Sequence, residues 1–304
     1  MLSADDLKIK KIEVPDSEYK SEVPQHFEEG WFPGFPSTTM ICGPPGRGKT
    51  NLFINLLTNP KMWNKLFDEI YWYGPTIKSD KLYKTIKVRD ENVVEDPKKI
   101  IPDLEKKLKE QTKKVKDNPA TAPKVLFVFE DMTAFFNTVQ SKPEFHRCYT
   151  QIRHVKGAAV TMVHKYHAFN RTNRTSSQHI ILFKANKKDI DHLYEEHGPT
   201  DMPVKDFRRL VNWALTPTED CPKPFFYINT TAEDSKQYRR NFDTIIELAD
   251  FSKSEDDAPE KNPYQTTDSD GRGTEREFER KKSRGNGRGG ARKRRKTNDP
   301  NGIY

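Results

Sequence analysis

The segment GPPGRGKT, residues 43–50, has the residue types and spacing that bind the phosphates of a nucleoside triphosphate. Its glycines let the backbone curl so that successive N–H groups can point at phosphate oxygens. Lys49 adds a positive charge for the β- and γ-phosphates, and the Thr50 hydroxyl can ligate Mg²⁺. A helix that starts here turns the positive end of its dipole towards the anion. The predicted ATP-binding residues are therefore Gly43, Pro44, Pro45, Gly46, Arg47, Gly48, Lys49 and Thr50.

A pair of carboxylates supplies the second part of this chemistry. In KVLFVFED, residues 124–131, five apolar residues are followed by Glu130 and Asp131. Phosphate-cleaving P-loop enzymes use one carboxylate to hold Mg²⁺ through water and another to orient the attacking water. We expect Glu130 to lie on the metal side with Thr50, and Asp131 on the water side, although the two roles could be exchanged. The alternative interpretation is that both residues only close a strand.

Strands and helices must alternate to position these groups. Apolar runs unbroken by polar residues predict strands buried on both faces of a parallel sheet, at 38–42, 69–73, 125–129, 158–163 and 179–183. Apolar residues recur at helical spacing from Leu52 to Leu57, and Pro60 stops that helix. Further helices are expected around 104–115, 135–153, 203–215 and 243–251, with a C-terminal hairpin between 225–229 and 236–240. The predicted fold class is α/β: a P-loop NTPase with a mainly parallel central sheet flanked by helices.

The interval between the two motifs adds a topological expectation. About 80 residues separate Lys49 from Asp131, and the strand at 69–73 falls among them. An extra strand between the two nucleotide-binding strands is the arrangement of ring-forming motor ATPases. Nucleotide kinases usually place those two strands side by side. We therefore expect the strand at 69–73 to be inserted between them.

Charge and composition point to a polyanionic partner. The 304 residues carry a net charge of +8, with a pI near 9.1, and 32% are charged. The mean hydropathy of −0.94 indicates that part of the chain lies outside a core. Three widely spaced cysteines without a CxxC pair suit a reducing compartment. No apolar run approaches the ~20 residues of a membrane span, and the N-terminus lacks a signal peptide, so we expect a soluble intracellular protein.

Composition also divides the chain into three parts. Residues 1–29 alternate polar, charged and proline positions and are predicted to be an arm, and residues 30–251 carry the ATPase pattern. Residues 252–304 are acidic and then basic, ending with the block KKSRGNGRGGARKRRK at 281–296. A segment of this composition cannot form a core, so we predict a disordered tail that contacts nucleic acid.

Five segments in one order resemble the genome-packaging ATPases of poxviruses, other large DNA viruses and virophages, which belong to the HerA/FtsK superfamily. They are GPPGRGKT, FDEIYWYGPT, VLFVFEDM, QIRHVKGAAVTMVHKYH and RTNRTSSQHIILFKAN, within about 33–196. The resemblance implies a homo-oligomeric ring, expected to be a hexamer, that hydrolyses ATP between subunits with Mg²⁺. It also implies that this ring drives double-stranded DNA into a capsid, with a capsid or portal protein as partner. The implied location is the nucleus or a cytoplasmic viral factory of the host cell, with association to the virion.

Two more site residues follow from the resemblance alone. In that family an arginine between the carboxylate motif and the next strand reaches into the neighbouring subunit's site, and Arg153 occupies that place. Such a finger contributes about 10³–10⁵ in rate. Arg171 and Arg174 are rival candidates, Arg47 could act within its own subunit, and the alternative is a surface arginine in a helix. His164 stands where the family usually has a glutamine that senses the γ-phosphate, which marks a divergent member.

Other functions remain open at this stage. A replication helicase, a nucleotide kinase, and a non-catalytic nucleotide-binding subunit that recruits DNA are all compatible with a P-loop. A DNA channel in the folded part could be lined by Lys184, Lys187, Lys188, Arg208, Arg209, Arg239 and Arg240.

Overall fold

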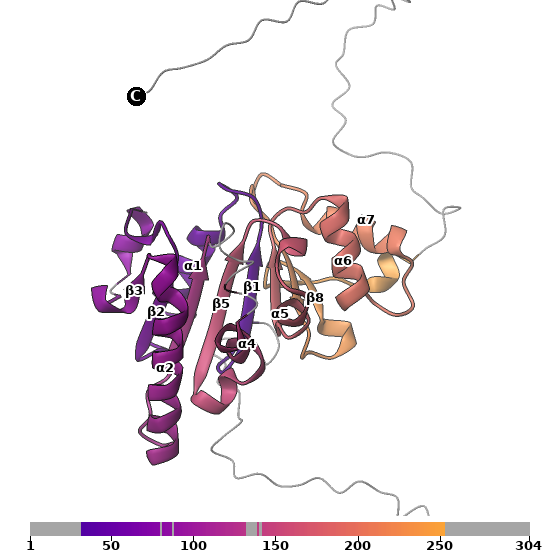
Figure 1. Cartoon of the computed structure of the whole chain (residues 1–304). Helices are drawn as coiled ribbons and strands as arrows, with labels where there is room; N and C mark the ends of the chain where they lie inside the picture. The colour runs from indigo at the N-terminus through magenta and orange to yellow at the C-terminus, as the bar shows by residue number, and fades with distance from the viewer. Residues whose placement is uncertain (1–31, 80, 87, 132–138, 140–141, 253–304) are drawn as a thin grey trace, which may run out of the picture. The chain divides into compact units, whose positions relative to one another are not determined.

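The computed structural model describes residues 32–79, 81–86, 88–131, 139 and 142–252. The predicted arm, and the predicted tail after Ser252, lie outside these residues. The described part forms one α/β unit in which helices cover both faces of a central sheet (Figure 1). None of its helices is long and apolar enough to cross a membrane.

In the described residues nine strands make a single sheet. Their order across the sheet is β3 (Val93–Val94), β2 (Glu69–Tyr73), β4 (Val125–Glu130), β5 (Gly157–Val163), β1 (Thr38–Cys42), β6 (His179–Leu182), β7 (Phe226–Asn229), β8 (Tyr238–Arg240) and β9 (Thr244–Ile245). The strands from β3 to β6 pair in parallel, and β7, β8 and β9 continue the sheet antiparallel. Every residue of β1, β5 and β6 is buried, as expected for strands covered on both faces.

An inserted strand is present, as predicted, but the expectation that it is the strand at 69–73 is wrong, because the strand in that place is β5. It pairs with β4 on one side and with β1 on the other, so it separates the two strands that carry the nucleotide motifs. β2, which falls between the motifs in the sequence, lies on the far side of β4.

The helices are α1 (Lys49–Thr58), α2 (Pro97–Asp117), α4 (Pro143–Thr150), α5 (Arg171–Thr175), α6 (Lys187–His197) and α7 (Val204–Ala214). Single 3₁₀ turns occur at Ile77–Ser79, Lys81–Thr85, Asp90–Asn92, Ile152–Val155, Tyr166–Ala168, Asp234–Lys236 and Leu248–Asp250. α2 begins where the Asp96 carboxylate accepts a hydrogen bond from the Lys98 N–H, with Pro97 in the first turn. It buries Ile100, Leu104 and Leu108, at four-residue spacing.

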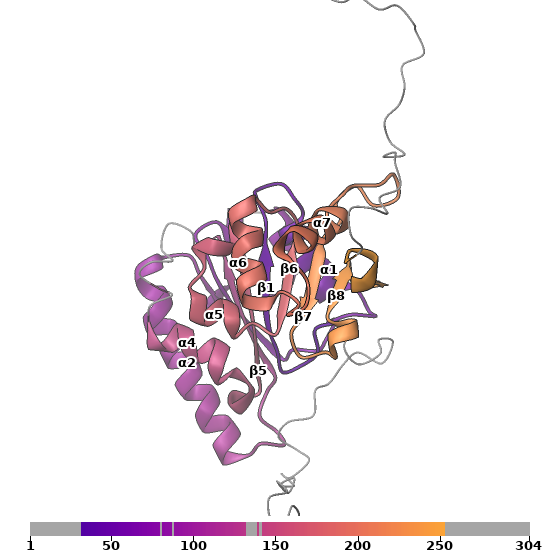
Figure 2. The ribbon, with the colours of Figure 1, turned by 90° about the vertical axis from the view of Figure 1, so that its right-hand side faces the viewer.

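Two apolar cores lie on opposite faces of the sheet. One contains the buried sides of α2, α4, α6 and α7, and Figure 2 shows α2, α4, α5 and α6 side by side along that face. The other contains α1, Trp63, Phe183 and Phe225. α1 follows β1 directly, so the loop that joins them lies at the carboxyl edge of the sheet.

The C-terminal end confirms one prediction and corrects another. β7 and β8 form the predicted hairpin. The predicted last helix at 243–251 is wrong, because residues 244–245 form β9 against β8 and only one 3₁₀ turn follows. The β-branched run Thr244, Ile245, Ile246 suits a strand, and pairing with β8 decides the outcome over helical spacing. Of the helix predicted at 135–153, the described part is α4 followed by a 3₁₀ turn, while 132–138 and 140–141 lie outside the described residues.

Candidate nucleotide site

The predicted phosphate-binding loop leaves the carboxyl end of β1 and runs into α1. Gly48 caps the helix with φ of 108°, a left-handed conformation that residues other than glycine rarely adopt. No side chain caps α1, and its first turn contains no acid. The first N–H groups of the helix therefore have no capping side chain, and the positive end of the dipole faces the loop.

Lys49 lies inside this loop and is 8% exposed. Its Nζ donates hydrogen bonds to the carbonyl oxygens of Gly43 at 2.8 Å and Pro44 at 3.3 Å. Burial lowers the pKa of Lys49 below its ordinary value, although the carboxylates of Asp131 and Glu130 oppose that shift. A buried ammonium held mainly by neutral carbonyls favours an anionic ligand.

Glu130 contacts the same loop from the end of β4. Its Oε1 accepts a hydrogen bond from the Thr50 hydroxyl at 2.8 Å, so the two predicted metal-side residues lie together. Its Oε2 accepts a hydrogen bond from Trp72 Nε1 at 3.1 Å. Trp72 was not among the predicted site residues, because a tryptophan within the strand at 69–73 is expected to pack in the core of the sheet. The acid at the end of β4 is the partner that its indole N–H required.

Asp131 turns the chain immediately after β4. Its φ of 47° is left-handed, a conformation in which Asp is enriched among non-glycine residues. Its Oδ1 lies 2.6 Å from Nε2 of His164, whose Nδ1 lies 3.3 Å from Lys49 Nζ. His164 therefore connects the lysine of the phosphate loop to the second carboxylate.

Three neighbouring strands deliver these parts to one edge of the sheet. β1 ends in the loop, β4 in Glu130 and Asp131, and β5 in His164. The carboxyl edge of a parallel sheet is where α/β proteins of this kind bind ligands.

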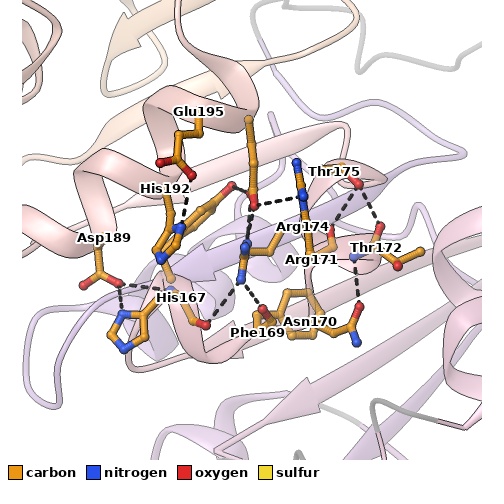
Figure 3. Close-up of polar contacts among 12 residues, drawn as sticks. His167, Phe169, Asn170, Arg171, Thr172, Arg174, Thr175, Asp189, His192 and Glu195 are labelled. Atoms are coloured by element: carbon orange, nitrogen blue, oxygen red, sulfur yellow. Dashed lines mark hydrogen bonds and ion pairs between the residues drawn. The ribbon is translucent and has the colours of Figure 1, made fainter. Parts of the chain in front are cut away.

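The loop that follows His164 is held by partly buried polar contacts (Figure 3). Tyr166 donates to Glu196 Oε2 at 2.7 Å, and His167 Nδ1 lies 2.7 Å from Asp189 Oδ1. Both acids are on α6, so this helix holds the chain that leaves β5.

The candidate finger arginines differ in their surroundings. Arg174 is buried, forms an ion pair with Glu196, and donates to the main-chain oxygens of His167 and Phe169 (Figure 3). These contacts hold its guanidinium inside the fold of the chain, which makes it a poorer finger candidate than an exposed arginine. Arg171 is 79% exposed, with Nε 3.9 Å from Glu196 Oε1, and Arg47 is exposed in the loop.

Arg153 lies in the 3₁₀ turn before β5, at the sheet edge opposite the phosphate loop. It lines a cavity of about 830 Å³ together with Gln178 and Lys236. The structure does not bring Arg153 to the phosphate loop of this chain, in contrast to Glu130, Asp131 and His164.

Arg239 was a predicted channel residue, and this is wrong, because it is fully buried. Its NH1 donates to the main-chain oxygen of Phe242.

Residues 33–212, which are 180 of the 304, match the family described as poxvirus A32 protein. The chain belongs to the poxvirus A32 protein family. This confirms the resemblance seen in the five motifs, and the matched segment of this A32-family chain contains every predicted site residue from Gly43 to His164. No curated protein sequence matches it.

Several solved structures are similar to this A32-family chain at low identity. One is the DNA-packaging ATPase B204 from Sulfolobus Turreted Icosahedral Virus, at 13% identity and a TM-score of 0.49, covering 67% of this chain and 96% of that one. Another is the genome packaging NTPase B204 from Sulfolobus turreted icosahedral virus 2 in complex with ATP-gammaS, at 12% identity, a TM-score of 0.46 and coverages of 69% and 98%. A third is EssC (ATPases 2 and 3) from Geobacillus thermodenitrificans, at 9% identity and a TM-score of 0.45, covering 73% of this chain and 41% of that one.

Proposed function

We propose that this A32-family protein is an ATP hydrolase that translocates double-stranded DNA and packages a viral genome into a capsid inside the infected cell. One observation carries the enzymatic part. The phosphate loop, the acid pair and His164 meet at the carboxyl edge of β1, β4 and β5, with Lys49, His164 and Asp131 in hydrogen-bond contact. Membership of the A32 family supports DNA as the molecule that this enzyme moves.

The chain's own residues divide the work of binding. Lys49 exchanges its contacts with Gly43 and Pro44 for the β- and γ-phosphates, and the N–H groups at the start of α1 contact the remaining phosphate oxygens. Thr50 and Glu130 supply oxygen atoms of the kind that Mg²⁺ prefers, at a place where they already touch. Those two residues would hold the ion, and when bound it neutralises charge on the phosphates.

Asp131 orients the attacking water in this proposal. Its Oδ1 is held by His164 Nε2, so the carboxylate keeps a fixed direction next to the phosphate loop. Because His164 also contacts Lys49, which binds the γ-phosphate, release of that phosphate changes the surroundings of the histidine and of Asp131 together. His164 thereby takes the sensing position that glutamine holds in the family.

Arg153 suits a finger that acts on a neighbouring subunit. It lies at the sheet edge opposite its own phosphate loop, and a head-to-tail ring brings opposite faces of successive subunits into contact. Arg153→Ala subunits should therefore bind ATP but hydrolyse it poorly. Mixing them with Lys49→Ala subunits should restore part of the activity, because each supplies what the other lacks at a shared interface. No recovery at any mixing ratio would remove Arg153 from this role.

The deciding experiment measures ATP hydrolysis with and without linear duplex DNA. We expect DNA to stimulate turnover by the wild type, Lys49→Ala to abolish it, and Lys61→Ala, a change at an exposed lysine beyond the end of α1, to leave it unchanged. Equal turnover with and without DNA would contradict translocation. Transfer of phosphate to an added nucleoside would favour a nucleotide kinase, and unwinding of a forked duplex would favour a helicase.

A further inference from the structure

A lysine from outside the matched family segment lies against the phosphate loop. Lys223 is in the connection between α7 and β7, and its Nζ donates a hydrogen bond to the carbonyl oxygen of Gly46 at 3.2 Å. Its Cδ lies 3.7 Å from where a Cβ on Gly48 would stand. We infer that Lys223 is a positioning residue of the nucleotide site. It orients the Gly46–Arg47 peptide and adds a positive charge for a nucleoside di- or triphosphate.

The geometry of the peptide unit gives the contact its effect. In a planar trans peptide the C=O and the following N–H point in opposite directions. When Lys223 holds the Gly46 oxygen on its own side, the Arg47 N–H must point to the other side of the same peptide. A Cβ built on Gly46 would meet no atom within 4 Å, so no other group of the described residues packs against that side of Gly46. The ammonium of Lys223 is the side-chain group that contacts the Gly46 oxygen, and it constrains the peptide through that contact.

Lys223 is held in place by its own connection. Pro222 and Pro224 flank it, which fixes their φ angles and restricts Lys223 to extended conformations. On one side, Thr218 and Cys221 exchange main-chain hydrogen bonds of 3.1 and 3.2 Å. Because both flanks are constrained, the backbone of Lys223 loses little conformational entropy when the ammonium reaches the loop.

On the other side of Lys223, Phe225 ties the connection to the phosphate loop. Its N–H donates to Asn241 Oδ1 at 3.1 Å, and its ring lies 5.4 Å from the ring of Phe183. Phe183 in turn lies against Gly43 and Gly48, since a Cβ on either glycine would meet its side chain. The connection and the phosphate loop therefore share one packed neighbour.

The inference rests on the proposed nucleotide site and predicts a particular pattern of affinities. Lys223→Met keeps the aliphatic stem and removes the charge and the donor, whereas Lys223→Arg keeps both. Binding of ATP, ADP and AMP to the full-length chain is measured by displacement of a fluorescent ATP analogue, beside hydrolysis kinetics. Loss of the oriented Arg47 N–H and of the nearby positive charge should weaken binding of ATP and ADP by about tenfold. AMP should change by less than about twofold, because it lacks the phosphates that this loop cradles.

The kinetic expectation separates positioning from a general defect. For Lys223→Met we expect KM for ATP to rise about tenfold with kcat within about threefold, and for Lys223→Arg we expect recovery to within about threefold of the wild type. Lys61→Met, at an exposed lysine outside the loop, is the matched control. The inference is overturned if Lys223→Met binds ATP as Lys61→Met does, if AMP weakens as much as ATP, or if arginine fails to rescue.

The variant Lys49→Ala distinguishes a failure of the Lys223 inference from a failure of the proposed function. If Lys49→Ala also binds ATP normally, the nucleotide site itself is misplaced. If Lys49→Ala loses ATP binding and Lys223→Met binds ATP normally, only the proposed role of Lys223 is refuted.

Discussion

Replacing Trp72 with phenylalanine tests whether the indole holds the metal-side carboxylate. Trp72 is 1% exposed, and its Nε1 donates to Glu130 Oε2 at 3.1 Å. The ring also packs edge-on against Phe53 with centroids 5.2 Å apart. Phenylalanine keeps an aromatic ring in that position and removes the donor, so Glu130 retains only the Thr50 hydroxyl of these two contacts.

The structure sets the size of the expected effect. A hydrogen bond to a charged group contributes about 1.5–3 kcal/mol. Glu130 is partly exposed, so water replaces part of the lost contact and the lower end of this range applies. If the hydrogen bond orients Glu130 for catalysis, about 1.4 kcal/mol corresponds to a tenfold loss of turnover. The smaller ring also leaves a cavity, which should lower the free energy of unfolding by about 1–2 kcal/mol.

Trp63→Phe is the control for that loss of packing. Trp63 is also 1% exposed, and its Nε1 donates to the main-chain oxygen of Pro33 at 2.8 Å, away from the nucleotide site. Both variants should melt a few degrees below the wild type. Only Trp72→Phe should lose turnover about tenfold and need more Mg²⁺ for half-maximal hydrolysis. Equal losses of turnover in the two variants, or wild-type turnover in Trp72→Phe, would refute the reasoning.

Three further predictions concern other parts of the chain. Glu196→Gln leaves the buried Arg174 without its opposing charge and should lower the free energy of unfolding by about 3–5 kcal/mol in urea titrations; a loss below about 1 kcal/mol would contradict this. Burial lowers the pKa of His179 to about 3, so between about pH 6.5 and 3 the unfolded chain takes up a proton that the folded one does not. Stability should therefore fall with decreasing pH in that window, by up to about 1.4 kcal/mol per pH unit from this residue, and an equally steep fall in His179→Gln would exclude it as the cause. Deleting 252–304 removes the nine basic residues of 281–296, so it should keep basal ATP hydrolysis but weaken DNA binding and flatten its salt dependence; an unchanged salt slope would leave the tail without that role.

The phosphate loop and the acid pair could be predicted because each is a run of adjacent residues. Gly48 must be a glycine for its φ of 108°, and Lys49 and Thr50 follow it directly into α1. Glu130 and Asp131 come immediately after the buried residues of β4. In both cases the residues that form the local strand and turn are adjacent in the sequence to the side chains that they position.

The identity of the inserted strand could not be predicted in this way. Position in the sequence pointed to 69–73, whereas β5 comes after both motifs and returns between β1 and β4. Strand order depends on how the connecting helices pack on the two faces of the sheet. A local sequence pattern does not predict this packing. The segment 243–251 failed for a related reason, because its pairing partner β8 determines its conformation.

Trp72 and Lys223 show what local patterns omit about the site. Trp72 reaches Glu130 because β2 and β4 pair with Tyr73 opposite Phe129. Lys223 reaches Gly46 from a connection 177 residues further along the chain. Neither residue carries a motif, so only the packing of distant segments reveals them.

The register of β5 against its two neighbours determines whether the site exists at all. Val163 pairs with Cys42 and Met162 with Glu130, and the Gly43 N–H continues the ladder by donating to the Val163 oxygen at 3.0 Å. His164 therefore follows β5 at the level where the phosphate loop begins. A slip of one residue would turn every side chain of β5 to the other face and separate His164 from Lys49 and Asp131. All seven residues of β5 are buried, so packing on both faces of the sheet fixes this register, and the contact between His164 and Asp131 is its consequence.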